Sequence, residues 1–230
     1  MWPADRDALI AEQRRLAVAS PPEWRPVSRA VAFGACVVCF ARGQTGVGAR
    51  GDRSWAAAAV MRGRRVVCEA TIDGQAGGPY EPGLLALREG PTLEAAVRAL
   101  RLPPDVLLVD ATGRDHPRGA GLALHLGAVL GLPTIGVTHR PLLASGDWPD
   151  DRRGATSPLL LDRERVGAWL RTRAGARPLA IHSGWRTSVE VAVEVAALAS
   201  SGNRTPEPFR RARWLARVAR TEAGEHRWCQ

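Results

Sequence analysis

Residues 105–137 constrain the fold more strongly than any other part of this 230-residue chain. They contain a short apolar strand at 105–109, a helical stretch at 119–130 and a second apolar strand at 134–137. Two strands that are joined through a helix, by a connection of about a dozen residues or more, pair in parallel. The segment therefore predicts an α/β protein with a sheet that is at least partly parallel.

Strand and turn signals upstream add an antiparallel part to this sheet. Residues 31–40 predict a strand, and 55–61 and 65–72 predict two more with a hairpin turn at Arg62 and Gly63. A last strand is expected at 179–183 and a polar loop at 140–158. Helices are expected at 5–19, 84–89, 92–100, 164–173, 188–200 and 207–220. We expect one mixed central β-sheet flanked by helices, in a single domain over 1–230.

Charge favours a polyanionic partner. The chain has 32 basic residues, all arginine, against 23 acidic ones, for a net charge of +9. A coding bias explains the choice of arginine over lysine, but it does not explain the excess of positive charge. Arginine forms planar two-point contacts with phosphate. Apolar runs stay well short of the roughly 20 residues of a membrane span, and no signal peptide is recognisable, so a cytoplasmic protein without a membrane partner is expected.

Cys36 and Cys39 form a C-x-x-C pair, for which metal and redox sites must be considered. The pair lies inside the predicted strand 31–40, where neighbours three positions apart face opposite sides. They are therefore not expected to share a metal or form a disulfide, and they are interpreted as small buried apolar residues.

Carboxylates at a strand end are the first candidates for chemistry. Asp110 ends the run 106–109, and ligands bind at the carboxyl ends of strands in open α/β sheets. Asp115 is better placed to cap the following helix, which leaves Asp110 without a structural role. Glu89 is by itself a plausible solvated surface residue. Carboxylates from separate elements are the ligands that Mg²⁺ takes for phosphodiester cleavage.

An unusual loop surrounds Tyr80, the only tyrosine of the chain. Pro79 and Pro82 stiffen it, and a rigid aromatic loop could enter between bases. The alternative is a tyrosine that covers the edge of the core.

Several motifs, in one order, resemble those of the endonuclease V family from about Arg6 to Ala216. Pro79-Tyr-Glu-Pro-Gly83 with Arg88-Glu89 is similar to the wedge loop of the family and the Arg-Glu after it. Leu108-Val-Asp110 with His116-Pro-Arg118 resembles its strand-end Asp and His-Pro-Arg, and Leu132-Pro-Thr-Ile-Gly-Val137 resembles its next strand. Ser188-Val189 and Pro206-Glu-Pro208 with Arg210 match weaker C-terminal motifs.

The resemblance implies an RNase H-like fold and a nuclease of DNA repair that is dependent on Mg²⁺ or Mn²⁺. Such an enzyme cuts on the 3′ side of deaminated bases such as inosine, in DNA or RNA. Glu89 and Asp110 would hold the metal, and His116 would support catalysis near the cut. The implied nucleic-acid contacts are Pro79, Tyr80, Pro82, Gly83, Leu85, Gly121, Leu122, His139 and Leu142. We expect a monomer, with a flexible tail at 221–230.

The chain departs from the family at its first strand, where an Asp is replaced by Val37 or by Cys36, depending on the alignment. His139 replaces a lysine, and Arg213 replaces an acidic residue or a histidine. An alternative hypothesis is therefore a weakened or inactive paralogue that binds damaged or single-stranded nucleic acid without cutting it. A third is an interaction protein that uses the eight scattered tryptophans.

Overall fold

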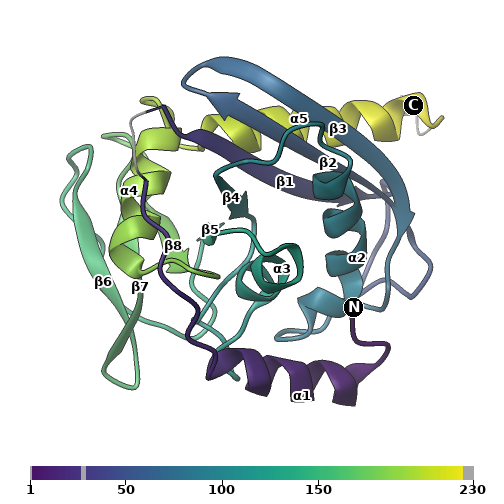
Figure 1. Ribbon diagram of the computed structural model, residues 1–230, viewed down its shortest axis with the longest axis horizontal. Coiled ribbons are helices and arrows are strands. Elements are labelled where there is room, and N and C mark those ends of the chain that lie inside the picture. The colour runs from purple at the N-terminus through teal and green to yellow at the C-terminus, as the bar shows by residue number, and fades with distance from the viewer. Residues whose placement is uncertain (1, 27–29, 225–230) are drawn as a thin grey trace.

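The computed structural model describes residues 2–26 and 30–224, in which one eight-stranded sheet has the order β3-β2-β1-β4-β5-β8-β7-β6 (Figure 1). The strands are β1 (Ala32–Phe40), β2 (Arg53–Arg62), β3 (Arg65–Gln75), β4 (Val106–Val109), β5 (Thr134–Thr138), β6 (Thr156–Leu161), β7 (Glu164–Leu170) and β8 (Leu179–Ser183). The helices are α1 (Arg6–Ala17), α2 (Leu85–Arg98), α3 (Leu122–Leu130), α4 (Val189–Ala199) and α5 (Glu207–Glu222). The predicted tail 221–230 lies mostly outside the described residues.

Both parallel and antiparallel pairs occur in the sheet, as predicted. β4 pairs in parallel with β1 and with β5, whereas the hairpin β2–β3 and the β6–β7–β8 end are antiparallel. Gly63, with φ +56°, stands in the predicted turn between β2 and β3. The mixed α/β class expected from residues 105–137 is confirmed.

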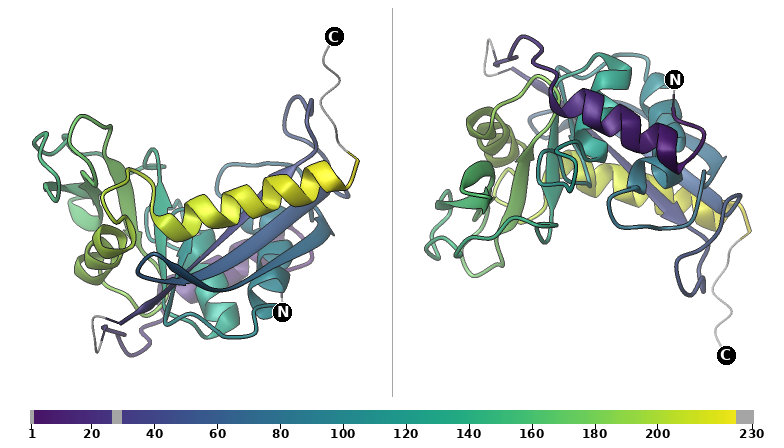
Figure 2. Two further views of the ribbon diagram at one scale, coloured as in Figure 1. Left: turned by 90° about the horizontal axis from the view of Figure 1, so that it is seen from above. Right: turned by 90° about the horizontal axis from the view of Figure 1, so that it is seen from below.

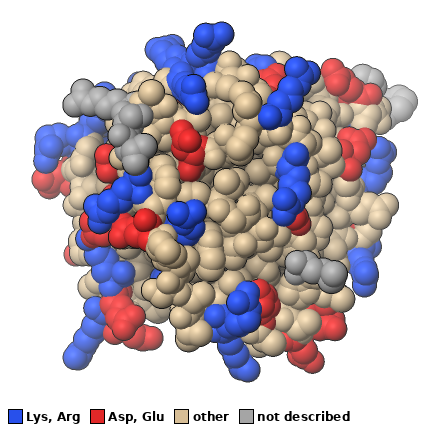
Figure 3. Space-filling view, viewed as in Figure 1, with Lys and Arg blue, Asp and Glu red and all other residues tan. Residues whose placement is uncertain are grey.

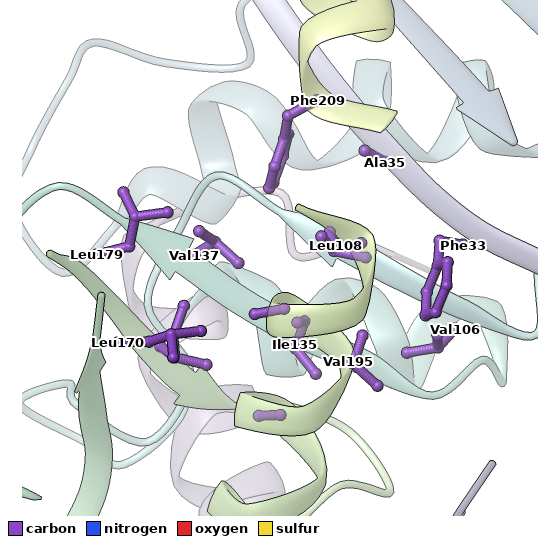
Figure 4. Close-up of a cluster of buried hydrophobic side chains, with 14 of the residues drawn as sticks. Phe33, Ala35, Val106, Leu108, Ile135, Val137, Leu170, Leu179, Val195 and Phe209 are labelled. Atoms are coloured by element: carbon purple, nitrogen blue, oxygen red, sulfur yellow. The ribbon is translucent and has the colours of Figure 1, made fainter. Parts of the chain in front are cut away.

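Helices cover both faces of the sheet. The even-numbered side chains of β1 and the odd-numbered ones of β4 pack under α2 and α3, while the alternate side chains pack under α4 and α5. α5 runs across the β1–β3 part of the sheet, and α1 lies outside α3 on the opposite face (Figure 2). Figure 4 shows how Phe209 of α5 and Val195 of α4 meet Leu108 and Ile135 in the core between sheet and helices. The carboxyl end of β4 is not covered in this way, and Asp110, which follows it, is exposed.

Two helix predictions need correction. Residues 164–173, predicted as a helix, form strand β7, which pairs with β6 and β8. Gly167 permits this close pairing, because a Cβ there would lie 2.5 Å from the carbonyl oxygen of Ile181. The polar loop predicted at 140–158 ends earlier than expected, because β6 begins at Thr156. Local periodicity did not reveal these strands, since their burial depends on partners distant in the sequence.

The two short helices predicted at 84–89 and 92–100 are one helix, α2, which continues through Pro91. Proline cannot donate to the carbonyl group four residues earlier, here that of Leu87. The loop at Gly77 lies against this part of the helix, where its N–H donates to the Arg88 carbonyl oxygen at 3.1 Å. Loop contacts from outside the helix thus support the turn that contains the proline. No helix within residues 2–26 and 30–224 has the length and apolar character needed to cross a bilayer.

Candidate active site

Two carboxylates from separate elements meet beside the carboxyl end of β4. Asp110 directly follows β4, and Glu89 lies in the first half of α2. Both side chains line a cavity of 260 Å³, together with Cys36 of β1 and Tyr80. The structure therefore brings Glu89 and Asp110 to one site, although they are 21 positions apart in the sequence.

The surroundings of Glu89 disfavour its negative charge. Burial raises the pKa of the Glu89 carboxyl to about 8, the charge of Asp110 contributes to the rise, and Arg88 opposes it. Arg88 itself is engaged elsewhere, because its guanidinium lies 3.1 Å from Asp52 and donates to the Gly78 carbonyl oxygen at 2.8 Å. Much of Glu89 therefore keeps its proton at neutral pH, and a cation bound in the cavity would favour its ionised form.

Cys36 occupies the position on β1 that faces these carboxylates. It pairs with Val109 in the parallel ladder and is 1% exposed, whereas Val37 packs on the other face of the sheet. Burial raises the pKa of the Cys36 thiol above its usual range, and the charges of Glu89 and Asp110 add to this. The residue opposite the carboxylates is thus a neutral thiol. Cys39 faces the opposite side and donates to Ala216 of α5, as expected for a strand.

A guanidinium approaches Asp110 from the other side. Arg213 of α5 lies 3.2 Å from the Asp110 carboxylate, and this ion pair is partly exposed. Both residues, together with His139, line a small cavity on the α5 side of the sheet. Arg213 supplies a positive charge where a bound metal ion would otherwise supply one, so the two compete for the same carboxylate.

The carboxylates suit a divalent ion held by few protein ligands. Mg²⁺ commonly binds through one or two carboxylates, with water and substrate phosphates completing its shell. Glu89 and Asp110 provide such a pair on one cavity. Within residues 2–26 and 30–224, however, there is no group of three or more His, Cys, Asp or Glu side chains placed to hold a metal. The ligand set therefore fits an ion whose binding depends on the substrate.

A second cavity, of 180 Å³, adjoins the carboxylates and is lined by both apolar and polar residues. Its wall contains Tyr80, Pro82, Gly83, Leu85, Leu122 and Leu142 from the predicted set, together with His116 and Asp110. Tyr80, which is 48% exposed, and Asp110 line both cavities. Since one water molecule occupies about 30 Å³ in the liquid, the cavity has room for a heterocyclic ring. We refer to it as the base cavity.

A hydrogen-bonded network holds the wall of the base cavity around Gly83. The carbonyl oxygen of Gly83 lies 3.0 Å from Nε2 of His116 and accepts from Gln13 at 3.0 Å and from Arg118 at 2.7 Å. The backbone N–H of Arg118 points to Nδ1 of His116, which places the ring proton on Nε2. Burial lowers the pKa of His116 to about 4, so the ring is neutral. Arg118 stands in the motif 116–118 but was not among the predicted site residues, and no local signal identified Gln13 of α1.

Asp115 has a different role from the helix cap that was predicted. The N-cap of α3 is Gly121, and Asp115 is fully buried six residues earlier. Its carboxylate accepts from the backbone N–H groups of Leu142, Leu143 and Ala144 at 2.6 to 2.8 Å. Three such bonds satisfy the oxygen atoms of this buried side chain. Asp115 therefore fixes the loop that carries Leu142 into the base cavity.

The remaining predicted contacts lie around this centre. Pro79 is exposed next to Tyr80. Gly121 supports the wall from behind, because a Cβ on it would meet the Thr112 carbonyl oxygen at 2.3 Å. His139 lines the small cavity beside Asp110 and an outer groove, but it does not line the base cavity.

Comparison with known proteins connects this geometry to one family. A sequence model described as "Endonuclease V" matches residues 44–214. The endonuclease V of Streptomyces coelicolor is 46% identical over 158 residues, which cover 69% of this chain and 68% of that protein. The endonuclease V of Methanopyrus kandleri is 41% identical over 170 residues, covering 73% of each.

Solved structures agree over almost the full length. The Streptomyces avermitilis endonuclease V has a TM-score of 0.85 at 37% identity, covering 97% of this chain and 96% of that one. The catalytic domain of human endonuclease V has a TM-score of 0.81 at 32% identity, covering 95% and 98%. An endonuclease V of Ciona intestinalis, solved with a 24mer DNA that contains an inosine, shares the fold with a TM-score of 0.78 at 19% identity, covering 94% and 98%.

Proposed function

Because the chain belongs to the endonuclease V family, we propose that it is a nuclease that recognises deaminated bases such as inosine and hydrolyses the phosphodiester on their 3′ side. One observation carries this proposal: Tyr80 and Asp110 line both the base cavity and the cavity of the carboxylates. A base held in the first cavity would place its own strand next to the second.

Recognition in this proposal begins with a flipped base. The base cavity receives the ring, and Tyr80, on a loop stiffened by Pro79 and Pro82, fills the space that the base leaves in the stack. A mispaired hypoxanthine is easier to extrude than a well-paired base, which contributes to selectivity. The network of Gln13, His116 and Arg118 keeps the Gly83 wall in place, so little ordering is needed when the base enters.

Cleavage in this proposal relies on Glu89 and Asp110. A Mg²⁺ or Mn²⁺ ion between them would activate water and neutralise charge on the leaving oxygen. Before it can act as a ligand, Glu89 must lose the proton that burial favours. Asp110 must exchange Arg213 for the cation. His116 is neutral and hydrogen-bonded to Gly83, so it contributes by positioning the wall beside the reacting strand.

A second candidate function is binding without cleavage. Two observations favour it: a buried thiol at Cys36 where a third oxygen ligand would stand, and the Arg213 guanidinium on Asp110. A guanidinium can balance the charge of a phosphate without a metal. The protein would then recognise deaminated strands and recruit no cation.

An assay with end-labelled oligonucleotides separates the two functions. Inosine-containing DNA and RNA strands, and matched adenosine controls, are incubated with Mn²⁺, Mg²⁺ or EDTA and resolved on a denaturing gel. We expect a metal-dependent cut 3′ to inosine that is lost in Asp110→Asn, while anisotropy shows that this variant still prefers the inosine strand. Preference for inosine without any cut supports the binding function. Neither preference nor cleavage would refute both.

The same proposal includes a role in DNA repair in the cytoplasm, with the single domain 1–230 acting as a monomer. Light scattering coupled to gel filtration tests the last point, because a monomer has a single mass near that of one chain. A stable dimer would contradict it.

A further inference from the structure

A groove beside the base cavity gathers positive charge from three distant segments. It has a volume of 440 Å³ and is lined by His139 and Arg140 after β5, by Ala176 and Arg177 before β8, and by Arg204 before α5. Arg140 and Arg177 are exposed, and Arg204 is partly buried. We call it the arginine groove.

Among the described residues, the arginines of this groove form no ion pair, whereas several other arginines of the chain are paired with a carboxylate. Arg211, for example, forms a two-point ion pair with Glu69. No ion pair within residues 2–26 and 30–224 involves Arg140, Arg177 or Arg204. On the face shown in Figure 3, blue and red side chains are interspersed, as on an ordinary protein surface. The described residues that line the arginine groove, by contrast, include no acidic side chain.

One of these guanidinium groups is held in place by the backbone. Nε of Arg204 donates to the carbonyl oxygen of Arg177 at 2.7 Å, and Nη2 donates to that of Pro178 at 3.4 Å. Burial lowers the pKa of Arg204, and the charge of Arg177 lowers it further. A positive group fixed next to a second one, with no counter-ion from the protein, is stabilised by an anion from outside.

The arginine groove is continuous with the site. Arg140 lines both this groove and the base cavity. His139 lines both this groove and the small cavity that contains Asp110 and Arg213. The base cavity, the small cavity and the arginine groove thus share lining residues and form one continuous surface.

We propose that the arginine groove binds successive phosphates of one arm of the nucleic acid, the arm that leaves the base cavity past His139. This inference rests on the proposed function for the position of the strand. Arginine recognises phosphate through a planar fork of N–H donors, and such contacts add affinity without selecting a sequence. The groove therefore strengthens binding, while the base cavity chooses the lesion.

The salt dependence of binding tests this proposal. Fluorescence anisotropy in EDTA measures the Kd of a fluorescein-labelled, inosine-containing single strand between 50 and 200 mM NaCl. Each phosphate contact on a single strand contributes about 0.7 to the slope of log Kd against log salt concentration. We expect Arg177→Gln to lower this slope by about 0.7 and Arg177→Gln/Arg204→Gln by about 1.4. Arg177 tests the proposal without disturbing the backbone hydrogen bonds of Arg204.

The control removes the same charge at the other end of the sheet. Arg64 and Arg65 are exposed at the β2–β3 hairpin, so Arg64→Gln/Arg65→Gln should leave the slope unchanged. When the strand is lengthened only on the 5′ side or only on the 3′ side of inosine, the groove variants should lower the salt slope for one of these two strands and not for the other. Equal slopes for wild type, groove variants and control would overturn the proposal. A wild type that binds inosine and adenosine strands equally would instead contradict the proposed function, and the slopes would still report on the groove.

Discussion

The wall of the base cavity and the cavity of the carboxylates are adjacent but are built on opposite electrostatic principles. Around Gly83, a neutral histidine, an amide and an arginine share hydrogen bonds with one carbonyl oxygen. Around Glu89, a carboxyl with a raised pKa faces a thiol and a second carboxylate that is paired with Arg213. The first region is complete without a ligand, whereas the second lacks a positive charge, which a bound cation would supply.

The comparison indicates that the wall around Gly83 is the rigid region, whereas the cavity of Glu89 and Asp110 is the reactive one. Satisfied hydrogen bonds fix the shape of a recognition surface. Neighbouring carboxyl groups disfavour one another's ionised form, and a cation bound between them would stabilise it. Four changes, in order of expected effect, test whether the two regions are as separate as this comparison suggests.

The largest effect on ligand affinity is expected from Cys36→Asp, which adds a third carboxylate to the cavity of Glu89 and Asp110. Affinity for Mn²⁺, measured by calorimetry, should rise by about 100-fold, because even supporting groups around metals are worth about 10- to 100-fold. Inosine binding in EDTA should not change. Cys36→Asn has a similar size without the charge and serves as the control. If both variants bind Mn²⁺ equally, the three positions do not share an ion.

Gly83→Ala should weaken affinity for the inosine strand about tenfold. A side chain at this positive φ strains the wall of the base cavity by about 1 kcal/mol or more. Gly83 has φ +80°, and a Cβ there would lie 3.1 Å from the Arg118 guanidinium. Gly78→Ala is the matched control in the same loop, where the nearest atom to a Cβ is 3.9 Å away. Unchanged anisotropy in Gly83→Ala would mean that the wall does not depend on this conformation.

An effect on stability, and not on ligand affinity, is expected from Glu89→Gln. The pKa of Glu89 is about 8 in the folded protein and 4.5 as the ordinary value, so the folded state binds more protons between these values. The unfolding free energy of the wild type therefore falls as pH rises from about 4.5 to about 8. Glu89→Gln should be more stable than wild type above pH 8, by up to about 5 kcal/mol because each pKa unit corresponds to about 1.4 kcal/mol, and equally stable near pH 4.

Denaturant titrations across this pH range measure the effect. Exposed Glu164 provides the control, because Glu164→Gln should show no such pH dependence. If the unfolding free energies of Glu89→Gln and wild type differ by the same amount at every pH, the difference comes from packing and not from ionisation.

The smallest effect is expected from Arg213→Gln. The ion pair with Asp110 is partly exposed, and such pairs contribute about 1 kcal/mol or less. Mn²⁺ affinity in the absence of nucleic acid should therefore rise about two- to fivefold. Arg217, exposed one turn later on α5, is the matched control, because Arg217→Gln removes the same charge away from Asp110. Equal gains in both variants would assign the effect to net charge alone.

Much of the fold could be predicted because its signals are local. The hairpin turn at Gly63, the buried strand before Asp110 and the periodic helices follow from residues close in sequence. The strand at Glu164–Leu170 was missed, since its apolar residues are buried by β6 and β8 and not by a helical repeat. α2 was divided at Pro91, because the supporting contact comes from Gly77 in a separate loop.

The same distinction between local signals and contacts distant in the sequence holds for the site. Asp110, Tyr80 and Gly83 stand in short motifs that could be recognised one at a time. Gln13 in α1 reaches the site across 70 residues to Gly83, and no pattern within α1 indicates this contact. Asp115 was assigned to a helix cap because that is a frequent local use of aspartate, but its partners lie 27 to 29 residues away.

The sequence by itself determined the family, the mixed α/β class and the strand end that carries Asp110, because periodicity, turn residues and ordered motifs are properties of the linear chain. Only the tertiary structure decided that Cys36, and not Val37, faces Glu89. Side chains alternate along a strand, so a shift of one position reverses the face, and pairing with Val109 sets that position. It also decided that Arg213 meets Asp110, because 103 residues separate them and only the packing of α5 on the sheet brings the two charges together.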